Sequence, residues 1–290
     1  MKKLAFIQSQ DRGHWVGDGF PVRSIFTYND RSAELSPFLL LDYAGPATFK
    51  PTDQRRGVGE HPHRGFETVT IVYSGEVEHR DSSGGGGIIG PGDVQWMTAG
   101  GGIVHEEFHG PGFAKNGGLF EVIQLWVNLP AKDKMAAPGY QGLTNAQIPR
   151  VEFAGGAGSV RVIAGDYHGN VGPARTFTPM NIWDVHLNAA TRADFEVPDG
   201  DTTGLFVLRG RVELPDGDVV GEAQFAALER AGGKLAIVAQ QDTTLLLLNG
   251  APIDEPVVGH GPFVMNTQRE IQQAIVDYQS GRMGRIVRQA

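Results

Sequence analysis

GEHPHRGFETVTIVYSG, residues 59–75, places two histidines where a β-strand is expected to begin. His61 and His63 are separated by one residue, and the β-branched, apolar run that follows ends at a turn glycine, Gly75. Residues two apart on a strand point to the same face of the sheet. The two imidazoles can therefore converge on one point, and a metal ion is the commonest group that imidazoles bind together.

A second pair with the same spacing lies in TAGGGIVHEEFHG, residues 98–110. His105 and Glu107 are two apart in a glycine-flanked β context, after a hairpin turn expected at residues 91–93. Antiparallel pairing of the two strands would bring both pairs together. Three imidazoles and one carboxylate form a mixed nitrogen and oxygen donor set that suits iron, manganese, cobalt, nickel, copper or zinc. Such a set leaves coordination positions open for water or substrate.

Glu67 is a further candidate, because it follows His63 by four residues in the same expected strand. In an unbulged strand it would share the face of His61 and His63, where it would support the metal or serve as a spare ligand. An ordinary ion pair with Arg64 explains this carboxylate equally well. Both alternatives stay open at the level of the sequence.

The other polar residues near the two pairs are assigned no ligand role. His79 and His109 are predicted to be solvent-exposed turn histidines. Glu106 and Phe108 have the opposite parity to His105 on the expected strand, so they should face away from the metal.

Composition limits the class of protein. A hydrophobic content of 40% and a charged content of 20% are typical of a soluble globular chain. The net charge of −8 gives no electrostatic reason to expect nucleic-acid binding. The absence of cysteine excludes disulfides, thiolate ligands and a cysteine nucleophile. No apolar run approaches the ~20 residues of a membrane-spanning helix, and the N-terminal one is too short for a secretory signal, so we expect a cytoplasmic protein.

Glycine and proline punctuate the chain and predict many short strands. There are 41 glycines and 17 prolines, and most apolar runs are short and bounded by turn residues. The sequence YSGEVEHRD at 73–81 is echoed by LRGRVELPD at 208–216, which indicates a duplicated fold. The polar segment 131–149 is expected to be the linker. We therefore predict two domains, residues 1–135 and residues 136–290.

One segment carries a helical pattern. In NTQREIQQAIVDYQSG, residues 266–281, Thr267 and Glu270 form a capping-box pattern and apolar residues recur at helical spacing. Gly281 is placed to end this helix. The predicted fold class is all-β, with two tandem antiparallel β-barrels and a C-terminal helix.

The second half departs from the metal-binding pattern. Where a duplicated H-x-H pair would fall, the chain reads PDGDTTG, residues 198–204, without a histidine. The histidines of this half, His168, His186 and His260, are scattered and unpaired. We expect the C-terminal barrel to be free of metal.

Three blocks of the sequence resemble the pirin family of the cupin superfamily. They are HPHRGFETVTIVYSGEVEHRD at 61–81, PGDVQWMTAGGGIVHEE at 91–107 and APIDEPVVGHGPFVMNTQREIQQAIVDYQSG at 251–281. The resemblance implies a bicupin, which has two tandem barrels of the jelly-roll type and one iron-type metal in the N-terminal barrel.

The resemblance also implies which residues hold the metal. The ligands of the family fall on His61, His63, His105 and Glu107. In the wider cupin superfamily, the ligand glutamate usually comes shortly after the H-x-H pair, where this chain has Glu67. In pirins the later glutamate takes that role, which favours Glu107.

An activity follows from the same resemblance. It implies a metal-dependent dioxygenase similar to quercetin 2,3-dioxygenase, which cleaves a flavonol with O₂ and releases carbon monoxide. Glu107 or Glu67 would accept the proton of the flavonol 3-hydroxyl as general base. The expected cofactor is one divalent transition metal, Fe(II) before Mn, Co, Ni, Cu or Zn. The expected partners are a small aromatic substrate and O₂, without direct nucleic-acid or membrane contact.

Two alternatives to this activity remain open. Some pirins resemble iron-binding, redox-sensitive regulators that act through protein partners. A metal-dependent isomerase or hydrolase on the same barrel is a third hypothesis and would consume no O₂. The sequence leaves undecided the native metal, the physiological substrate, the identity of the base and the oligomeric state.

Overall fold

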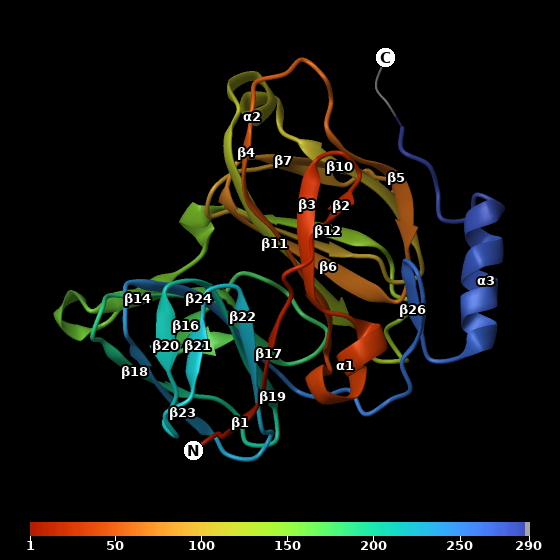
Figure 1. Ribbon diagram of the computed structural model, residues 1–290. Coiled ribbons are helices and arrows are strands. Elements are labelled where there is room, and N and C mark those ends of the chain that lie inside the picture. The colour runs from red at the N-terminus through yellow and green to blue at the C-terminus, as the bar shows by residue number, and fades with distance from the viewer. Residues whose placement is uncertain (288–290) are drawn as a thin grey trace. The chain divides into compact units, whose positions relative to one another are not determined.

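The computed structural model describes residues 1–287 and divides into two compact units, each built around two antiparallel sheets (Figure 1). The unit that carries the H-x-H pair is called the first barrel, and the other is called the second barrel. Of the described residues, the first barrel contains 12–33, 38–145 and 253–287. The second barrel consists of residues 1–11, 34–37 and 146–252.

The two units do not follow the expected division into residues 1–135 and 136–290. Strand β1 (Leu4–Ser9) pairs with β22 (Gln224–Leu228) and so belongs to the second barrel. Helix α3 (Gln268–Gln279) packs on the first barrel through Ile271 and Ala274. Strand β1 and helix α3 therefore each belong to the unit that buries their apolar side chains, not to the unit nearest in sequence.

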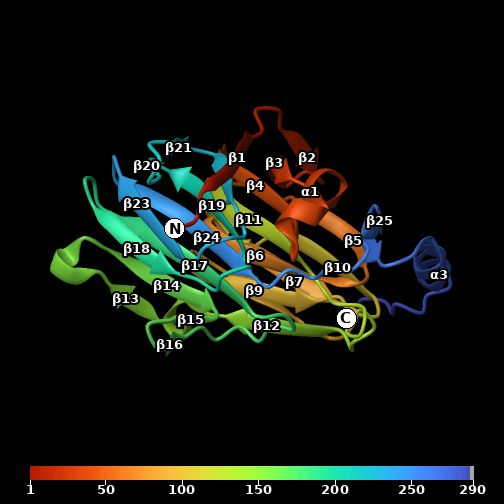
Figure 2. The same cartoon turned by 90° about the horizontal axis from the view of Figure 1, so that it is seen from below.

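The first barrel pairs a seven-stranded sheet with a four-stranded sheet (Figure 2). The larger sheet has the order β12 (Gly139–Leu143), β9 (Val94–Thr98), β6 (Phe66–Ser74), β11 (Gly118–Asn128), β4 (Phe38–Phe49), β3 (Phe20–Phe26) and β2 (His14–Val16). The smaller sheet has the order β5 (Gly57–His63), β10 (Ile103–His109), β7 (Val77–Asp81) and β8 (Gly86–Ile89). Further elements are α2 (Pro111–Asn116), the hairpin of β25 (Val258–His260) and β26 (Phe263–Met265), and most of α1 (Tyr28–Leu35), whose last two residues are assigned to the second barrel.

The core of the first barrel lies between its two sheets. Phe120 and Val72 contribute from the larger sheet, and Val77 and Ile89 contribute from the smaller one. Phe49 packs edge-to-face against Phe120, with their ring centroids 5.8 Å apart. Burial of these apolar side chains stabilises the closed arrangement of the sheets.

Segment 131–149, expected to be a linker, is largely ordered in the first barrel. Residues 139–143 form β12, which pairs with β9 at the edge of the larger sheet. The Lys134 ammonium is buried and donates to Gly65 O, Asn128 Oδ1 and Val264 O at 2.8, 2.8 and 2.9 Å. Burial lowers the pKa of Lys134 to about 8. Hydrogen bonds, which leave no apolar pattern in a sequence, therefore order this polar segment.

The second barrel repeats the combination of seven and four strands. Its larger sheet has the order β1, β22, β19 (Thr202–Arg209), β24 (Thr243–Gly250), β17 (Met180–Leu187), β14 (Gly158–Ala164) and β13 (Arg150–Glu152). Its smaller sheet has the order β18 (Arg192–Glu196), β23 (Lys234–Ala239), β20 (Arg211–Glu213) and β21 (Val219–Gly221). The remaining elements are β15 (Asp166–Tyr167), β16 (Asn170–Val171), η1 (Asn145–Gln147) and η2 (Ala154–Gly156).

The echoed sequences occupy equivalent places in the two barrels. In the first barrel the chain leaves β6 of the larger sheet and enters β7 of the smaller sheet through Gly75. In the second barrel it passes from β19 to β20 through Gly210 in the same way. Both glycines have left-handed backbone angles, with φ of 90° and 85°. The expected duplication is therefore present, and His79 of the first copy corresponds to Leu214 of the second.

The strand that was expected to continue from the H-x-H pair breaks after His63. Strand β5 ends there, and β6 begins at Phe66 in the other sheet of the barrel. Gly65 forms the break with φ of 91°, and its N–H donates to Gly100 O at 2.8 Å. The parity argument that placed Glu67 on the face of His61 and His63 is therefore wrong, because a change of sheet separates them.

Helix α3 begins and ends where the sequence predicts. Thr267 caps it by accepting from the Glu270 N–H at 3.2 Å, and Gly281 follows its end with φ of 76°. Asp277 of this helix pairs with the Arg64 guanidinium at 2.9 Å. This ion pair connects helix α3 to Arg64, the residue that follows His63. None of the helices within residues 1–287 has the length and apolar character needed to cross a membrane.

Gly65 gives a prediction about stability. A Cβ at this residue would lie 2.0 Å from Val264 O, in a backbone conformation that L-residues rarely adopt. We expect Gly65→Ala to lower the free energy of unfolding by at least about 2 kcal/mol. Gly59→Ala is the matched control, because a Cβ there meets no atom within 4 Å. Equal melting temperatures for the two variants, measured by circular dichroism, would contradict the role given to Gly65.

Candidate metal centre

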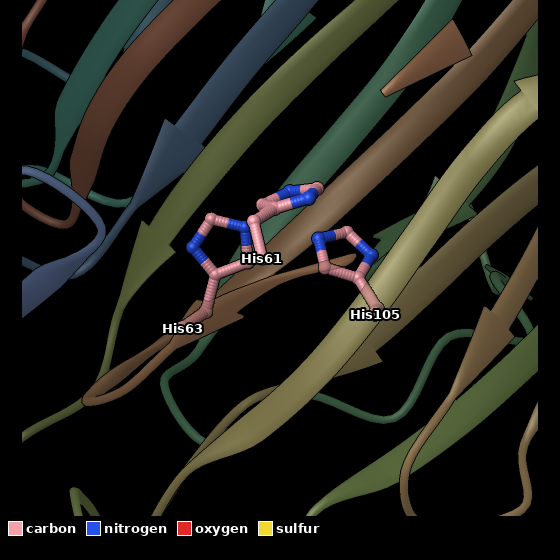
Figure 3. A group of neighbouring side chains, drawn as sticks. All are labelled: His61, His63 and His105. Atoms are coloured by element: carbon pink, nitrogen blue, oxygen red, sulfur yellow. The ribbon is translucent and has the colours of Figure 1, made fainter. Parts of the chain in front are cut away.

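Three histidines of the smaller sheet of the first barrel face one another. Strands β5 and β10 are antiparallel neighbours, with His105 opposite His61 and Ile103 opposite His63. Because His61 and His63 share a face, all three imidazoles project to the same side of the sheet. Figure 3 shows the rings turned toward one another, and one ring nitrogen from each lies within 4.8 Å of the others. The structure therefore brings together the three histidines predicted from sequence.

The state of these rings fits a metal ion. His63 Nδ1 and His105 Nε2 are buried and have no hydrogen-bond partner within residues 1–287. His61 Nδ1 donates to Gly59 O at 2.8 Å, which leaves its Nε2 as the nitrogen with a free lone pair. Burial holds the pKa values of His63 and His105 well below the ordinary value, so both rings are neutral at pH 7. Neutral imidazole is the form that binds metals.

Glu107 lies on the same face of β10, two residues beyond His105. Its Oε1 accepts from Gln95 Nε2 at 2.8 Å and from Thr70 Oγ1 at 3.4 Å. Its Oε2 accepts from Gln124 Nε2 at 3.1 Å. Gln124, Thr70 and Gln95 are paired across β11, β6 and β9, so they form one polar row across the larger sheet. The carboxylate is therefore buried but well supplied with donors.

Glu107 also belongs to a second group of potential ligands, with His79 and His105. One donor atom from each lies within 4.8 Å of the others, and all three side chains are buried. His105 belongs to both this group and the cluster of three histidines, so Glu107 lies beside that cluster.

His79 and His109 are not exposed, contrary to the expectation from sequence. His79 is 0% exposed and His109 is 5% exposed. His109 donates from Nε2 to Gly19 O at 2.8 Å and packs against the Phe49 ring. Strand parity is a signal that could have placed His79 inside, because Val77 and Asp81 on the same face are buried as well.

His79 and Asp81 form a buried pair on β7 behind His105. His79 Nε2 lies 3.0 Å from Asp81 Oδ2. Burial by itself would raise the pKa of Asp81, but hydrogen bonds from His79 and Ser83 hold this pKa below its ordinary value. The Tyr140 ring stacks on His79 with a centroid distance of 5.0 Å. Burial, together with the negative charge of Glu107, raises the pKa of Tyr140 to about 12.

The surroundings of Glu67 match neither the role at the metal nor the ion pair with Arg64 that the sequence suggested. It lies on β6, and its Oε1 accepts from Thr98 Oγ1 at 2.7 Å, while its Oε2 is buried without a partner in the described chain. Arg64, the alternative partner, instead pairs with Asp277 and donates to Gly101 O. Burial raises the pKa of Glu67 to about 7. Within residues 1–287, Glu67 is part of neither ligand group.

Glu106 and Phe108 lie on the opposite face of β10, as their parity predicts. The Arg55 guanidinium pairs with Glu106 Oε1 at 2.9 Å and stacks over the Phe108 ring at 3.7 Å from its centroid. The positive charge of Arg55 offsets the negative charge of Glu106 on the face of the strand that points away from the histidines.

A pocket within the first barrel adjoins the histidine cluster. His61 and Glu107 form part of its wall. The other lining residues are mostly apolar: Val16, Phe20, Val22, Ala44, Val58, Val122, Asp42, Thr70 and Gln124. Asp42 Oδ1 is buried without a hydrogen-bond partner among the described residues, and burial raises the pKa of this carboxyl. Asp42 was missed at the level of the sequence, because a single aspartate in an apolar strand carries no spacing signal.

The sequence matches two family descriptions along most of its length. Residues 19–127 match "Pirin", and residues 182–284 match "Pirin C-terminal cupin domain". The chain belongs to the pirin family. This pirin therefore has the all-β bicupin fold that the resemblance implied, with a C-terminal helix.

Individual relatives extend over nearly the whole chain. This pirin is 56% identical over 282 residues to a Pseudomonas aeruginosa protein provisionally named a quercetin 2,3-dioxygenase. The alignment covers 97% of this chain and 98% of that protein. The crystal structure of a quercetin 2,3-dioxygenase from Acinetobacter baumannii superposes on this chain with a TM-score of 0.96 and 50% sequence identity. The superposition covers 99% of this chain and 100% of that one. Mouse pirin is 37% identical over 262 residues, which is 86% of this chain and 83% of that protein.

The raised pKa of Glu67 predicts how stability depends on pH. The pKa of the folded state is about 7, against an ordinary value of 4.5. Between these values the folded protein binds more protons than the unfolded chain, so the free energy of unfolding decreases as the pH rises through 7. Relative to Glu67→Gln, we expect the wild type to lose about 2.5 kcal/mol of unfolding free energy between pH 5 and pH 8.

Urea unfolding of both metal-free proteins at several pH values measures this difference. A difference that stays constant across this pH range would show that Glu67 keeps an ordinary pKa in the folded state.

Proposed function

We propose that the first barrel is the active site of a metal-dependent dioxygenase that cleaves a flavonol such as quercetin with O₂ and releases carbon monoxide. The observation that carries this proposal is a cluster of three converging imidazoles beside a mostly apolar pocket. The neighbouring proteins named as quercetin 2,3-dioxygenases support the same reaction class.

The donor set would hold one divalent transition metal. His61, His63 and His105 supply three imidazole nitrogens, and Glu107 is the proposed fourth ligand because it adjoins His105. Fe(II) is the favoured ion, and Mn, Co, Ni, Cu and Zn suit the same donors. When bound, the ion supplies Lewis acidity toward a substrate oxygen and redox chemistry toward O₂.

Glu107 is the proposed general base. It lines the pocket, so one of its oxygens can reach the acidic 3-hydroxyl of a flavonol and take its proton. The donors Gln95, Thr70 and Gln124 orient the carboxylate and stabilise its charge. Glu67, the other candidate base, contacts Thr98 and is not among the residues that line this pocket.

The walls of the pocket suit a flat aromatic molecule with a few hydroxyl groups. Phe20, Val22 and Val122 offer apolar surface to the rings and exclude water. Asp42 offers a buried oxygen that has no partner within residues 1–287, and this oxygen can accept a hydrogen bond from a substrate hydroxyl. Asp42 and Gln124 are directly opposite each other on β4 and β11, so the polar row continues along the pocket from Glu107 to Asp42.

Reconstitution with Fe(II) under anaerobic conditions tests the reaction. We expect about one metal per chain and equal consumption of quercetin and O₂ by the wild type. His61→Ala, His63→Ala and His105→Ala should each lower metal affinity at least tenfold and reduce turnover to background. His168→Asn is the control, because His168 is exposed in the second barrel.

Two results would count against the proposal. Retention of metal by all three alanine variants would mean that these histidines are not the ligands. Stoichiometric metal binding without any consumption of quercetin or O₂ would favour a regulatory protein that acts through protein partners.

Asp42 gives a separate prediction about substrate binding. We expect Asp42→Ala to raise KM for quercetin about tenfold while kcat and metal content change little, because the lost contact is made equally in the ground and transition states. Asp42→Asn keeps an accepting oxygen and should raise KM less. Steady-state kinetics of the iron-loaded proteins measures both parameters, and an unchanged KM in the alanine variant would remove Asp42 from the binding site.

A further inference from the structure

Two polar residues lie deep in the first barrel, directly behind the histidine cluster. On β7, Asp81 is opposite His105, and His79 is opposite Glu107. His79 is 0% exposed and Asp81 is 3% exposed. Burying such groups costs free energy unless every donor and acceptor finds a partner.

The duplicated fold shows that this position does not require a polar residue. The residue of the second barrel that corresponds to His79 is Leu214, which is part of an apolar core. An apolar side chain is therefore compatible with the scaffold at this point. Folding alone therefore does not account for a buried histidine at this position.

The hydrogen bonds around Asp81 decide where His79 carries its proton. Asp81 Oδ1 accepts from Ser83 N, Ser83 Oγ and Gly85 N at 2.8, 2.6 and 3.0 Å. Its Oδ2 is left for His79 Nε2 at 3.0 Å. A carboxylate only accepts, so His79 carries a proton on Nε2.

The other side of the His79 ring is set independently by Gln95. Gln95 Nε2 donates to the Glu107 carboxylate at 2.8 Å, which fixes the orientation of the amide. The same NH₂ group lies 3.2 Å from His79 Nδ1. His79 Nδ1 is therefore an acceptor, in agreement with the proton placed on Nε2.

His105 is the next member of this chain of hydrogen bonds. Its Nδ1 lies 3.3 Å from His79 Nδ1. Because His79 Nδ1 accepts, its single lone pair is shared between the Gln95 Nε2–H and the His105 Nδ1–H. With its proton on Nδ1, the neutral His105 ring keeps its lone pair on Nε2. Nε2 is the buried nitrogen of His105 that has no partner among the described residues.

We propose that His79, held by Asp81, is a positioning residue that fixes the tautomer of His105 and directs its Nε2 lone pair toward the metal. The inference rests on the metal centre of the proposed function but not on its reaction. A ligand nitrogen must be free of its proton, so a metal-binding histidine needs a partner for its other nitrogen. His79 is that partner for His105, as the Gly59 carbonyl is for His61.

The chain of hydrogen bonds from Asp81 through His79 to His105 is called the relay, and three substitutions test it. His79→Leu introduces the residue of the second barrel and removes the acceptor. His79→Asn keeps an oxygen close to the position of Nδ1 and so can restore the acceptor. Asp81→Asn preserves the shape of the side chain but replaces one accepting oxygen by a donor, which favours the opposite tautomer of His79.

Co(II) affinity, measured by competition with a chelator, is the first readout. We expect His79→Leu and Asp81→Asn to weaken Co(II) binding 10- to 100-fold and to change the visible absorption of bound Co(II). His79→Asn should bind within about threefold of the wild type. Melting temperatures of the metal-free proteins separate this effect from a loss of folding.

Long-range ¹H–¹⁵N NMR of metal-free protein with ¹⁵N-labelled histidine is the second readout. We expect His105 of the wild type to carry its proton on Nδ1. A proton on Nε2 in the wild type, or unchanged Co(II) affinity in a folded His79→Leu variant, would overturn the proposal. Two Co(II) ions per wild-type chain, with one lost in His79→Leu, would also overturn it and make His79 a ligand.

The outcomes also separate this inference from the proposed function. If the wild type binds Co(II) and His79→Leu binds it equally well, only the relay fails. If the wild type binds no metal but His105 has the expected tautomer, the metal centre fails and only the assignment of the His105 tautomer stands.

Discussion

The register of β10 against its two neighbours is the constraint on which the first barrel depends. His105 is opposite His61 on one side and opposite Asp81 on the other. A slip of one residue on either side would turn these side chains to the other face of the sheet. One extra residue in β5, between the pairs Val58–Glu107 and His61–His105, bends this strand while leaving the register at the histidines intact. The candidate ligands, the relay and the pocket wall at Glu107 all follow from this alignment.

The barrel interior can hold the carboxylates of Glu107 and Asp81 because each of them accepts several hydrogen bonds. Glu107 is held by the row of polar residues that crosses the larger sheet, and Asp81 is held by the turn that follows β7. The second barrel has the same combination of sheets but packs Leu214 and other apolar side chains at the corresponding place. Two copies of one scaffold therefore differ in chemistry through the residues on their inner faces, which is how folds acquire separate functions.

The C-terminal segment supports the candidate metal centre from outside the sheet that carries it. Arg64, which follows His63, pairs with Asp277 of α3 and donates to Gly101 O. Lys134 ties Gly65 to Val264 through two backbone carbonyls. These contacts fix the chain at the point where it leaves β5 for the other sheet, so the positions of His61 and His63 depend on residues about 200 positions later in the sequence.

The sequence by itself determined the features that rest on local spacing. One H-x-H pair and one H-x-E pair, both with strand parity, predicted the three converging histidines. Short apolar runs between glycines predicted the β-class, and the capping pattern at Thr267 predicted helix α3. The tertiary structure alone decided the break at Gly65, the membership of α3 in the first barrel, and the burial of His79, Asp81 and Asp42. The physical reason is that parity and periodicity are properties of neighbouring residues, whereas burial and hydrogen bonding depend on which distant strands pair.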